Sequence, residues 1–262
     1  MKVAAAQLTF TSGDLVKNTN KMLEYVSAAA KNRADVVFFP EMSDTGYEIP
    51  VIRDKAQYWD RGTVPELCDT ARANKINVIA GVSERTDGGI FNSIVVIDRY
   101  GKVVGKYRKT HLIKAKPFFE HECFTAGDSL DTFTVEGMNC GFMTCYDIRF
   151  PEVAGTLRNK GAEAIFVPAA FPLVRQTHWL ALLTARAIEN QVFMIGANRV
   201  GTDGEVTFAG TSTIIDPYGT ILSSASAIHE GLISAEIGSE LVEQIRSQFK
   251  VHEDRRPSLY RM

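Results

Sequence analysis

Cys145 is the residue that the sequence places best to act as a nucleophile. It follows the apolar stretch 140–144 and precedes Pro151 and Glu152, which are typical of a first helical turn. The pattern predicts a short buried strand, a turn at the cysteine and then a helix. The thiol is therefore expected at the carboxyl edge of a sheet, where open α/β sheets place their reacting groups. A nearby helix N-terminus also makes a thiolate easier to form. Taken alone, a single cysteine is more often a small buried hydrophobe.

Glu41 is a second candidate, because it directly follows the apolar run 36–40. The β-branched and aromatic residues of this run favour a fully buried strand over a short core helix. An acid after such a strand is predicted to lie at the carboxyl edge of the sheet, where Cys145 is also expected. The alternative role for Glu41 is a helix N-cap or a solvated loop acid.

Lys109 is a third candidate, and its assignment is open at this point. It lies in the basic segment 102–111, which follows a predicted hairpin turn at 98–101. The alternative role for Lys109 is one more solvated cation of a basic strand. Spacing alone does not distinguish it from Lys106 or Arg108.

Three blocks of the sequence resemble the signature blocks of the carbon–nitrogen hydrolases, the nitrilase superfamily of amidases, nitrilases and carbamoylases. The resemblance implies a Glu–Lys–Cys triad at Glu41, Lys109 and Cys145. It covers almost the whole chain, in order and at family-like spacing. The three blocks are 39–41 with 45–47, 107–112 and 145–152, and further similar segments are 127–128, 185–191, 198–201 and 215–219.

The resemblance also implies how these residues act on a C–N bond. Glu41 takes the thiol proton and passes it to the leaving amine, while Lys109 favours the thiolate and stabilises the oxyanion. The backbone N–H of Tyr146 supplies a second oxyanion donor. Water then hydrolyses the thioester acyl-enzyme.

A supporting glutamate of the family precedes the Gly-Asp turn by seven positions. In this chain that residue is Glu120, and Glu122 is its only close competitor. Glu120 is expected to position Lys109 or the substrate amide.

The amidase branches resemble the chain more than the true nitrilases do, because Tyr146 and Asp147 stand where nitrilases usually carry Trp-Glu. Among them it is most similar to the ω-amidase-like hydrolases, which act on 2-oxoglutaramate and related short linear amides. Nitrile and N-carbamoyl substrates stay open as alternatives. Candidate substrate-binding residues are Tyr47, Phe171 and Arg175. A guanidinium suits a carboxylate, although a solvated surface arginine is at least as consistent with the sequence.

Composition limits the class of protein. The 262 residues, 45% of them hydrophobic, suit one large α/β domain, and the net charge of -2 without a basic block argues against nucleic acid or membrane partners. The start of the chain is too quickly polar for a signal peptide, and the four cysteines lack CxxC spacing. These features indicate a cytoplasmic protein with free thiols. No P-loop or GxGxxG motif occurs, so no nucleotide cofactor is expected.

Strand and helix patterns alternate along the chain, without a linker or an internal repeat. A single domain over 1–262 is predicted, with a polar, arginine-rich tail at about 251–262. The resemblance implies a four-layer α-β-β-α sandwich of the α/β class and a homodimer or higher homo-oligomer. Strands are expected at 3–7, 36–39, 78–82, 94–97, 164–167, 192–197, 212–215 and 231–236, and helices near 14–31, 178–190 and 239–249.

Three rival interpretations stay open. His111 suggests a Cys–His dyad, but nothing in the sequence orients its ring. A metal-dependent phosphoesterase would need several Asp and His ligands at strand ends, and the His-Glu pairs at 121, 229 and 252 lack the second histidine of a zinc motif, so no metal site is expected. The third is a non-catalytic ligand-binding protein of the same fold.

Overall fold

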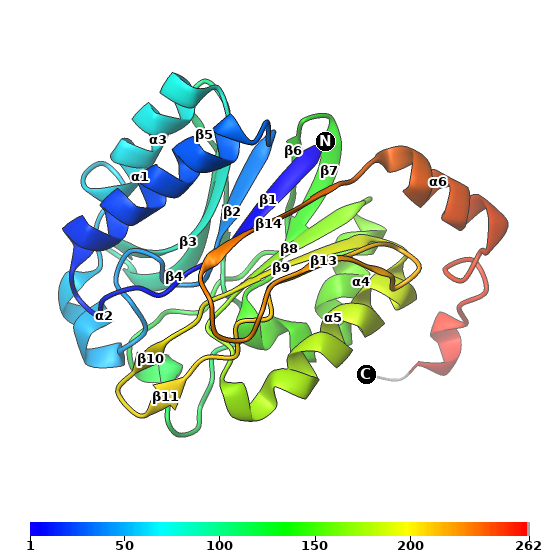
Figure 1. The fold of residues 1–262 in the computed structure, drawn as a ribbon. Coiled ribbons are helices and arrows are strands. Elements are labelled where there is room, and N and C mark those ends of the chain that lie inside the picture. The colour runs from blue at the N-terminus through cyan, green and yellow to red at the C-terminus, as the bar shows by residue number, and fades with distance from the viewer. Residues whose placement is uncertain (261–262) are drawn as a thin grey trace.

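Two six-stranded sheets lie face to face in the computed structural model, which describes residues 1–260 (Figure 1). The first sheet has the order β14-β1-β2-β3-β4-β5, in which β1, β2 and β3 run parallel and the other neighbours pair antiparallel. Its strands are β1 Lys2–Gln7, β2 Val36–Phe39, β3 Asn77–Thr86, β4 Gly89–Ile97, β5 Val103–Arg108 and β14 Gly231–Glu236.

The second sheet repeats this arrangement. Its order is β13-β12-β9-β8-β7-β6, with β7, β8 and β9 parallel in the middle. Its strands are β6 Thr132–Val135, β7 Met138–Phe142, β8 Ala164–Ala169, β9 Phe193–Asn198, β12 Thr213–Ile215 and β13 Ile221–Ser224. A separate hairpin is formed by β10 Thr202–Asp203 and β11 Val206–Thr207.

Helices cover the outer face of each sheet. Helices α1 (Leu15–Lys31) and α3 (Thr63–Asn74) pack on the first sheet, and α4 (Pro151–Asn159) and α5 (Gln176–Asn190) pack on the second (Figure 1). Between the sheets the core is apolar, and the rings of Phe38 and Phe166 meet edge to face at 5.2 Å. The predicted four-layer α-β-β-α sandwich is therefore confirmed.

The remaining helical elements lie outside these layers. Two are α-helices, α2 (Ile49–Lys55) and α6 (Ser239–Gln248), and the others are the 3-10 turns η1 Glu120–Glu122, η2 Cys145–Arg149, η3 Leu173–Arg175 and η4 Pro257–Leu259. The segment after α6 is largely exposed, and the last two residues of the predicted tail lie outside the described residues. No helix of residues 1–260 combines the length and the apolar character needed to cross a membrane.

Most expected elements are present, with some differences. The strand predicted at 140–144 ends at Phe142, because the N–H of Thr144 donates to Asp147 and leaves the ladder. Helix α3 was not expected. Its apolar stripe has three buried members, Val64, Leu67 and Ala71, too few to stand out among polar neighbours.

The carboxyl ends of the parallel strands in both sheets meet at one edge of the sandwich. The chain leaves β2 toward Glu41 and leaves β8 toward Ala170, and these two residues share a hydrogen bond of 2.8 Å between the Ala170 N–H and Glu41 Oε2. This edge is where an α/β sheet presents reacting groups.

Candidate active site

Glu41 is fully buried at the end of β2. Its position depends on Gly81 of β3, because a Cβ there would lie 2.5 Å from the carbonyl oxygen of Pro40 and 2.8 Å from the Cα of Glu41. The N–H of Ser43 donates to the carbonyl of Gly81 at 2.8 Å, which closes the turn. The backbone of Glu41 therefore lies directly against β3, at a distance that only a glycine at position 81 allows.

Lys109 directly follows β5 and is also fully buried. Its N–H donates to the carbonyl of Asn92 and its carbonyl accepts from the N–H of Gly127, both at 2.8 Å. Its Nζ donates to Glu41 Oε1 at 2.9 Å and to Glu120 Oε1 at 2.6 Å. One ammonium group thus joins two carboxylates that come from distant parts of the chain.

Glu120, rather than Glu122, faces this cluster. Glu120 is fully buried in η1, whereas Glu122 is exposed. The second carboxylate oxygen of Glu120 accepts from the N–H of Ile113 at 2.8 Å, and its first also accepts from the hydroxyl of Tyr47.

Tyr47 is held in turn by a buried ion pair. Its N–H donates to Asp203 Oδ2 at 2.8 Å, and Asp203 accepts two hydrogen bonds from the guanidinium of Arg199, at 2.6 and 3.0 Å. Nothing in the sequence around Asp203 indicates this role. The hairpin β10–β11 therefore supports the far side of the Glu120 carboxylate.

Cys145 begins the 3-10 turn η2 with a φ of 45°, in the left-handed region that non-glycine residues seldom adopt. Helix α4 begins at Pro151, as predicted, so the turn separates the thiol from the helix N-terminus. The side chain is buried, with 4% of the residue exposed. The N–H of Ala170, which binds Glu41, also faces the thiol.

The pKa of Cys145 is shifted in the direction opposite to the one expected from the sequence, where a helix N-terminus was expected to favour the thiolate. Burial raises the pKa of Cys145 well above its ordinary value, and the negative charge of Glu41 raises it further, while Lys109 only partly offsets both. The thiol is therefore neutral at rest. A buried neutral thiol needs a base to take its proton before it can act as a nucleophile, and the carboxylate of Glu41 lies close enough to affect its pKa.

The lysine and its second carboxylate are shifted as well. Burial opposes the charge of Lys109, but the attraction of Glu120 and Glu41 outweighs it and raises the pKa of the lysine well above its ordinary value. Burial also raises the pKa of Glu120, which Lys109 only partly offsets. The cluster thus holds a charged ammonium group, two buried carboxyl groups and a neutral thiol, all of them shielded from water.

The side chain of Asp147 holds His111 in place. Its carboxylate oxygen Oδ1 accepts from the backbone N–H of His111 and lies 3.0 Å from the ring Nδ1, and the ring stacks on Phe150 at 3.8 Å between centroids. The His111 ring is therefore oriented, contrary to expectation. It is also not in a strand, because β5 ends at Arg108.

The other predicted residues are placed less centrally. Tyr146 is half-buried and meets Phe150 edge to face at 5.3 Å. Phe171 is buried in the apolar cluster that contains Cys145 and packs against Trp179. Arg175 is exposed in η3 and forms no ion pair within residues 1–260. The backbone places Arg175 outside the buried cluster.

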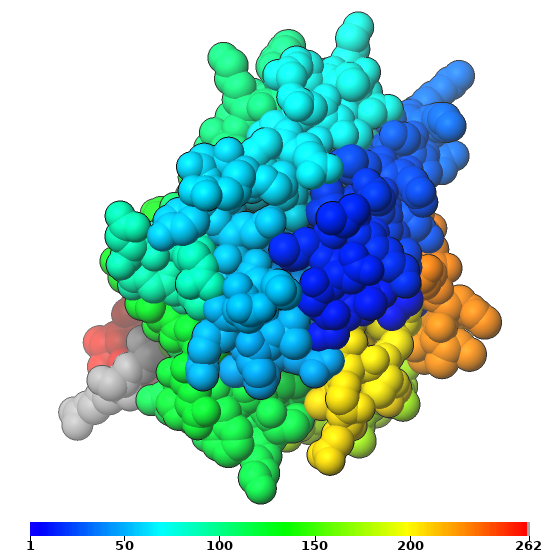
Figure 2. All heavy atoms as spheres, turned by 90° about the vertical axis from the view of Figure 1, so that its left-hand side faces the viewer, coloured from blue at the N-terminus to red at the C-terminus, as the bar shows by residue number. Residues whose placement is uncertain are grey.

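Two hollows open above the cluster. One, of about 340 Å³, is lined by Arg175, Phe118 and β11, and the other, of about 230 Å³, by Tyr47, α2 and the same Phe118. Figure 2 shows α2 in light blue beside the yellow hairpin β10–β11 on this face. Phe118 also meets Tyr47 edge to face at 5.5 Å. The second hollow reaches the buried cluster through Tyr47, whose hydroxyl donates to Glu120.

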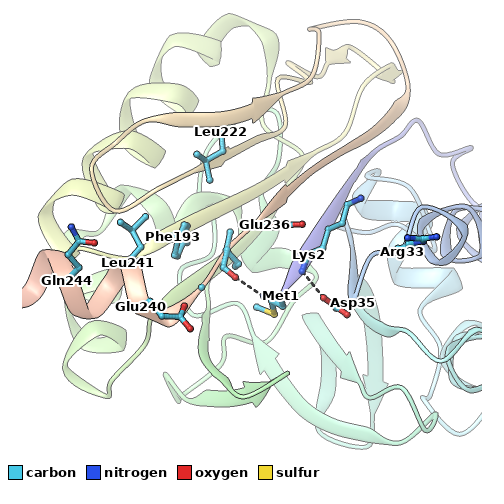
Figure 3. A pocket seen from close by; sticks show the side chains of 12 residues that line it. Met1, Lys2, Arg33, Asp35, Phe193, Leu222, Glu236, Glu240, Leu241 and Gln244 are labelled. Carbon is cyan, nitrogen blue, oxygen red and sulfur yellow. Dashed lines mark hydrogen bonds between the residues drawn. The ribbon is translucent and has the colours of Figure 1, made fainter.

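A larger hollow lies elsewhere. It measures about 990 Å³ and is lined by the start of β1, the end of β14 and the first turn of α6, where the terminal ammonium of Met1 donates to Ile237 at 2.7 Å (Figure 3). Because β1 and β2 are parallel, the start of β1 lies at the opposite edge from Glu41. No group of three or more His, Cys, Asp or Glu side chains in residues 1–260 is arranged to hold a metal ion.

Comparisons with known proteins agree with this geometry. A 2-oxoglutaramate amidase of Bacillus subtilis is 34% identical over 259 residues, covering 98% of each chain. A nitrilase of Pyrococcus abyssi is 34% identical over 267 residues, covering 99% of each. The crystal structure of a carbon–nitrogen hydrolase from Helicobacter pylori has a TM-score of 0.91 at 27% identity, covering 99% of this chain and 96% of that one.

The sequence profile of the carbon–nitrogen hydrolases matches residues 2–247. Together with relatives of this identity and full length, the match covers both sheets, all four layers and the buried cluster at their common edge. The chain therefore belongs to the carbon–nitrogen hydrolase family and is an enzyme.

Proposed function

We propose that this enzyme hydrolyses the amide group of a small linear amide and releases ammonia, with Cys145 as nucleophile, Glu41 as general base and acid, and Lys109 as the fixed cation. The observation that carries the proposal is the closed contact of Lys109 with Glu41 and Glu120 beside a neutral buried thiol. Amidase relatives of similar length support the class of reaction.

The proposed reaction has two halves. Sγ of Cys145 attacks the amide carbon while the thiol proton moves to Glu41, and the C–N bond then breaks as Glu41 returns that proton to the leaving nitrogen. Water next gives a proton to Glu41 and attacks the thioester, which breaks the S–C bond, reprotonates the thiol and releases a carboxylic acid. Lys109 and the N–H of Tyr146 stabilise the oxyanion in both halves.

The nucleophile is tested by Cys145→Ala together with mass spectrometry of the substrate-treated wild type. We expect a folded, inactive variant and an acyl adduct on Cys145, with none on Cys68, Cys123 or Cys140. An adduct on another cysteine, or full turnover by Cys145→Ala, would overturn the mechanism.

We further propose an ω-amidase-like substrate, 2-oxoglutaramate or a similar short amide with a distal carboxylate. Arg175 supports this, because it lines one of the two hollows beside Phe118 and has no ion-pair partner among the described residues. Acidic amides should then react faster than neutral amides of equal length, and Arg175→Ala should abolish that preference only. Equal wild-type rates on both would leave a general aliphatic amidase.

A nitrilase activity is the second candidate, because one full-length relative bears that name at the same identity. A panel of small amides, nitriles and N-carbamoyl compounds scored for ammonia release separates the two candidates and also covers carbamoyl hydrolysis. Release from nitriles alone would replace the amidase proposal.

The domain organisation, the cellular location and the oligomeric state are also part of the proposal. We infer one catalytic domain over 1–262, a cytoplasmic location and a homodimer. Exposed apolar side chains on α5 and near β13 support the dimer, and Ile188 lies against the turn at Gly219 between them. Light scattering at micromolar concentration should give a dimer, and Ile188→Asp should shift it toward monomer. A wild-type monomer would contradict the proposal.

A further inference from the structure

Asn92 on β4 contacts two of the proposed catalytic residues at once. Its backbone carbonyl accepts the N–H of Lys109 at 2.8 Å, and its side-chain Nδ2 donates to Glu41 Oε1 at 2.7 Å. The residue is 1% exposed and pairs with Ser83 of β3 across the sheet. It therefore links the segment that carries the cation to the carboxylate that faces the thiol.

Only one end of the Asn92 amide is bonded within residues 1–260. Nδ2 has its partner in Glu41, but the buried Oδ1 has none. An unpaired buried acceptor is destabilising, so an amide present for stability alone would have both ends satisfied. The one-sided bonding indicates that the side chain serves Glu41.

The bond also fixes how the Glu41 carboxylate is rotated. The last torsion of a glutamate side chain is soft, so hydrogen bonds decide where each oxygen lies. Oε1 accepts from Asn92 and Lys109, which leaves Oε2 toward Ala170, whose N–H also faces the Cys145 thiol. Without the Asn92 donor, one bond from Lys109 to Oε1 and one from Ala170 to Oε2 would remain, and the carboxylate could rotate more freely relative to the thiol.

We propose that Asn92 is a positioning residue that holds Glu41 in line with Cys145 through its side chain and with Lys109 through its backbone. This inference rests on the proposed function. It goes beyond it by assigning a role to a residue that touches neither the thiol nor the substrate and that lies outside the three signature blocks.

The test compares Asn92→Ala with a matched control, Asn190→Ala. Asn190 is likewise buried and its Nδ2 also makes one hydrogen bond, to the carbonyl of Arg186 at 3.0 Å, but it lies on α5 away from the cluster. Both variants should lose a similar amount of thermal stability. Only Asn92→Ala should lose about 10- to 100-fold in kcat with little change in KM, the effect of a misplaced catalytic group. Wild-type kcat in Asn92→Ala, or an equal loss in Asn190→Ala, would overturn the proposal.

A second variant covers the case in which Asn92→Ala does not fold. Asn92→Asp keeps the size of the side chain but replaces the donor with an acid facing Glu41 Oε1. Two adjacent carboxylates do not both ionise easily, so the acidic limb of the kcat/KM profile should move to higher pH. A residue that acts only in folding would lower stability and leave the profile in place, and an unmoved profile would overturn the proposal.

Cys145→Ala, measured in parallel, distinguishes a failure of the proposed function from a failure of the role proposed for Asn92. Turnover by Cys145→Ala would refute the proposed function and this inference with it. An inactive Cys145→Ala beside a fully active Asn92→Ala would refute only the role of Asn92.

Discussion

Two clusters of charge occupy neighbouring positions of the hairpin β4–β5, and they are built in opposite ways. In the outer cluster one acid, Glu84, accepts from Arg108 at 2.7 and 2.8 Å and from Lys106 at 2.8 Å. In the inner cluster one cation, Lys109, is shared by two acids, at 2.9 and 2.6 Å. Successive side chains of an extended backbone point to opposite sides, so Arg108 at the end of β5 and Lys109 directly after it enter different environments.

The two environments shift their acids in opposite directions. Burial opposes the charge of Glu84, but hydrogen bonds from Arg108, Lys106 and Ser93 outweigh it and lower the pKa of Glu84. In the inner cluster burial and a second carboxylate leave the pKa of Glu120 raised. An acid with two cations at a partly exposed site stays ionised and forms a stable ion pair. Two acids that share one cation in a buried site hold a proton more readily, which is a property of groups that transfer protons.

The sharpest test of this difference is Lys109→Met against Arg108→Met. Loss of the inner cation should lower kcat by about 100- to 1000-fold, the usual effect of removing one oxyanion donor. Loss of the outer cation should leave kcat nearly unchanged, since Glu84 retains Lys106. Steady-state kinetics on the same amide measures both, and equal losses would remove the functional distinction between the clusters.

Residues of one catalytic unit should also be non-additive. Glu41→Gln and Lys109→Met are each expected to lose far more in kcat than in KM, and the double variant should lose much less than the product of the single losses. Kinetics of the three variants gives the coupling. Full additivity would show that the two residues act independently.

Tyr47→Phe should have a smaller effect, because it removes only a hydroxyl that donates to Glu120. A hydrogen bond to a charged group contributes about 1.5 kcal/mol or more, which corresponds to about tenfold in kcat if the bond acts in the transition state. Tyr58→Phe is the control, since its hydroxyl lies 3.3 Å from Asp87 at an exposed site. Equal kcat in Tyr47→Phe and wild type would place Tyr47 outside the catalytic support.

Glu84→Gln should change stability rather than rate, and only at some pH values. Because the folded-state pKa of Glu84 is lowered, its charge stabilises the fold above the unfolded value of about 4.3, and this contribution is lost as pH falls through the folded pKa. The melting temperature of wild type should exceed that of Glu84→Gln at pH 7, and the gap should shrink on acidification below about pH 4. A gap independent of pH would contradict the assignment.

The sequence predicted the fold and the ends of the strands better than it predicted which residues make hydrogen bonds to one another in the site. Glu41 could be placed because the run before it is too apolar to lie anywhere but inside the sandwich. Lys109 could not be separated from Arg108 by spacing, since the choice depends on which side of the strand is covered by the second sheet. The family resemblance, rather than the residues alone, made that choice.

The residues that support the site could not be predicted from the sequence, for a physical reason. Asn92, Gly81 and Asp203 act through strand pairing and loop contacts between segments that are far apart in the sequence, and each has an ordinary local context. The direction of the Cys145 pKa was also not predictable, because it depends on how completely the fold excludes water. A helix N-terminus near the thiol suggested the opposite sign.

The closed, neutral state of Cys145 has a consequence for how the enzyme ages. Oxidation of cysteine starts from the thiolate and requires access by peroxide. A thiol that is almost entirely out of water and whose pKa is raised well above its ordinary value offers the oxidant neither. Cys68 and Cys123, which are partly exposed, are the sulfur atoms that oxidants reach first. If Cys145 is the nucleophile proposed above, the burial that keeps its thiol neutral also protects the enzyme between turnovers.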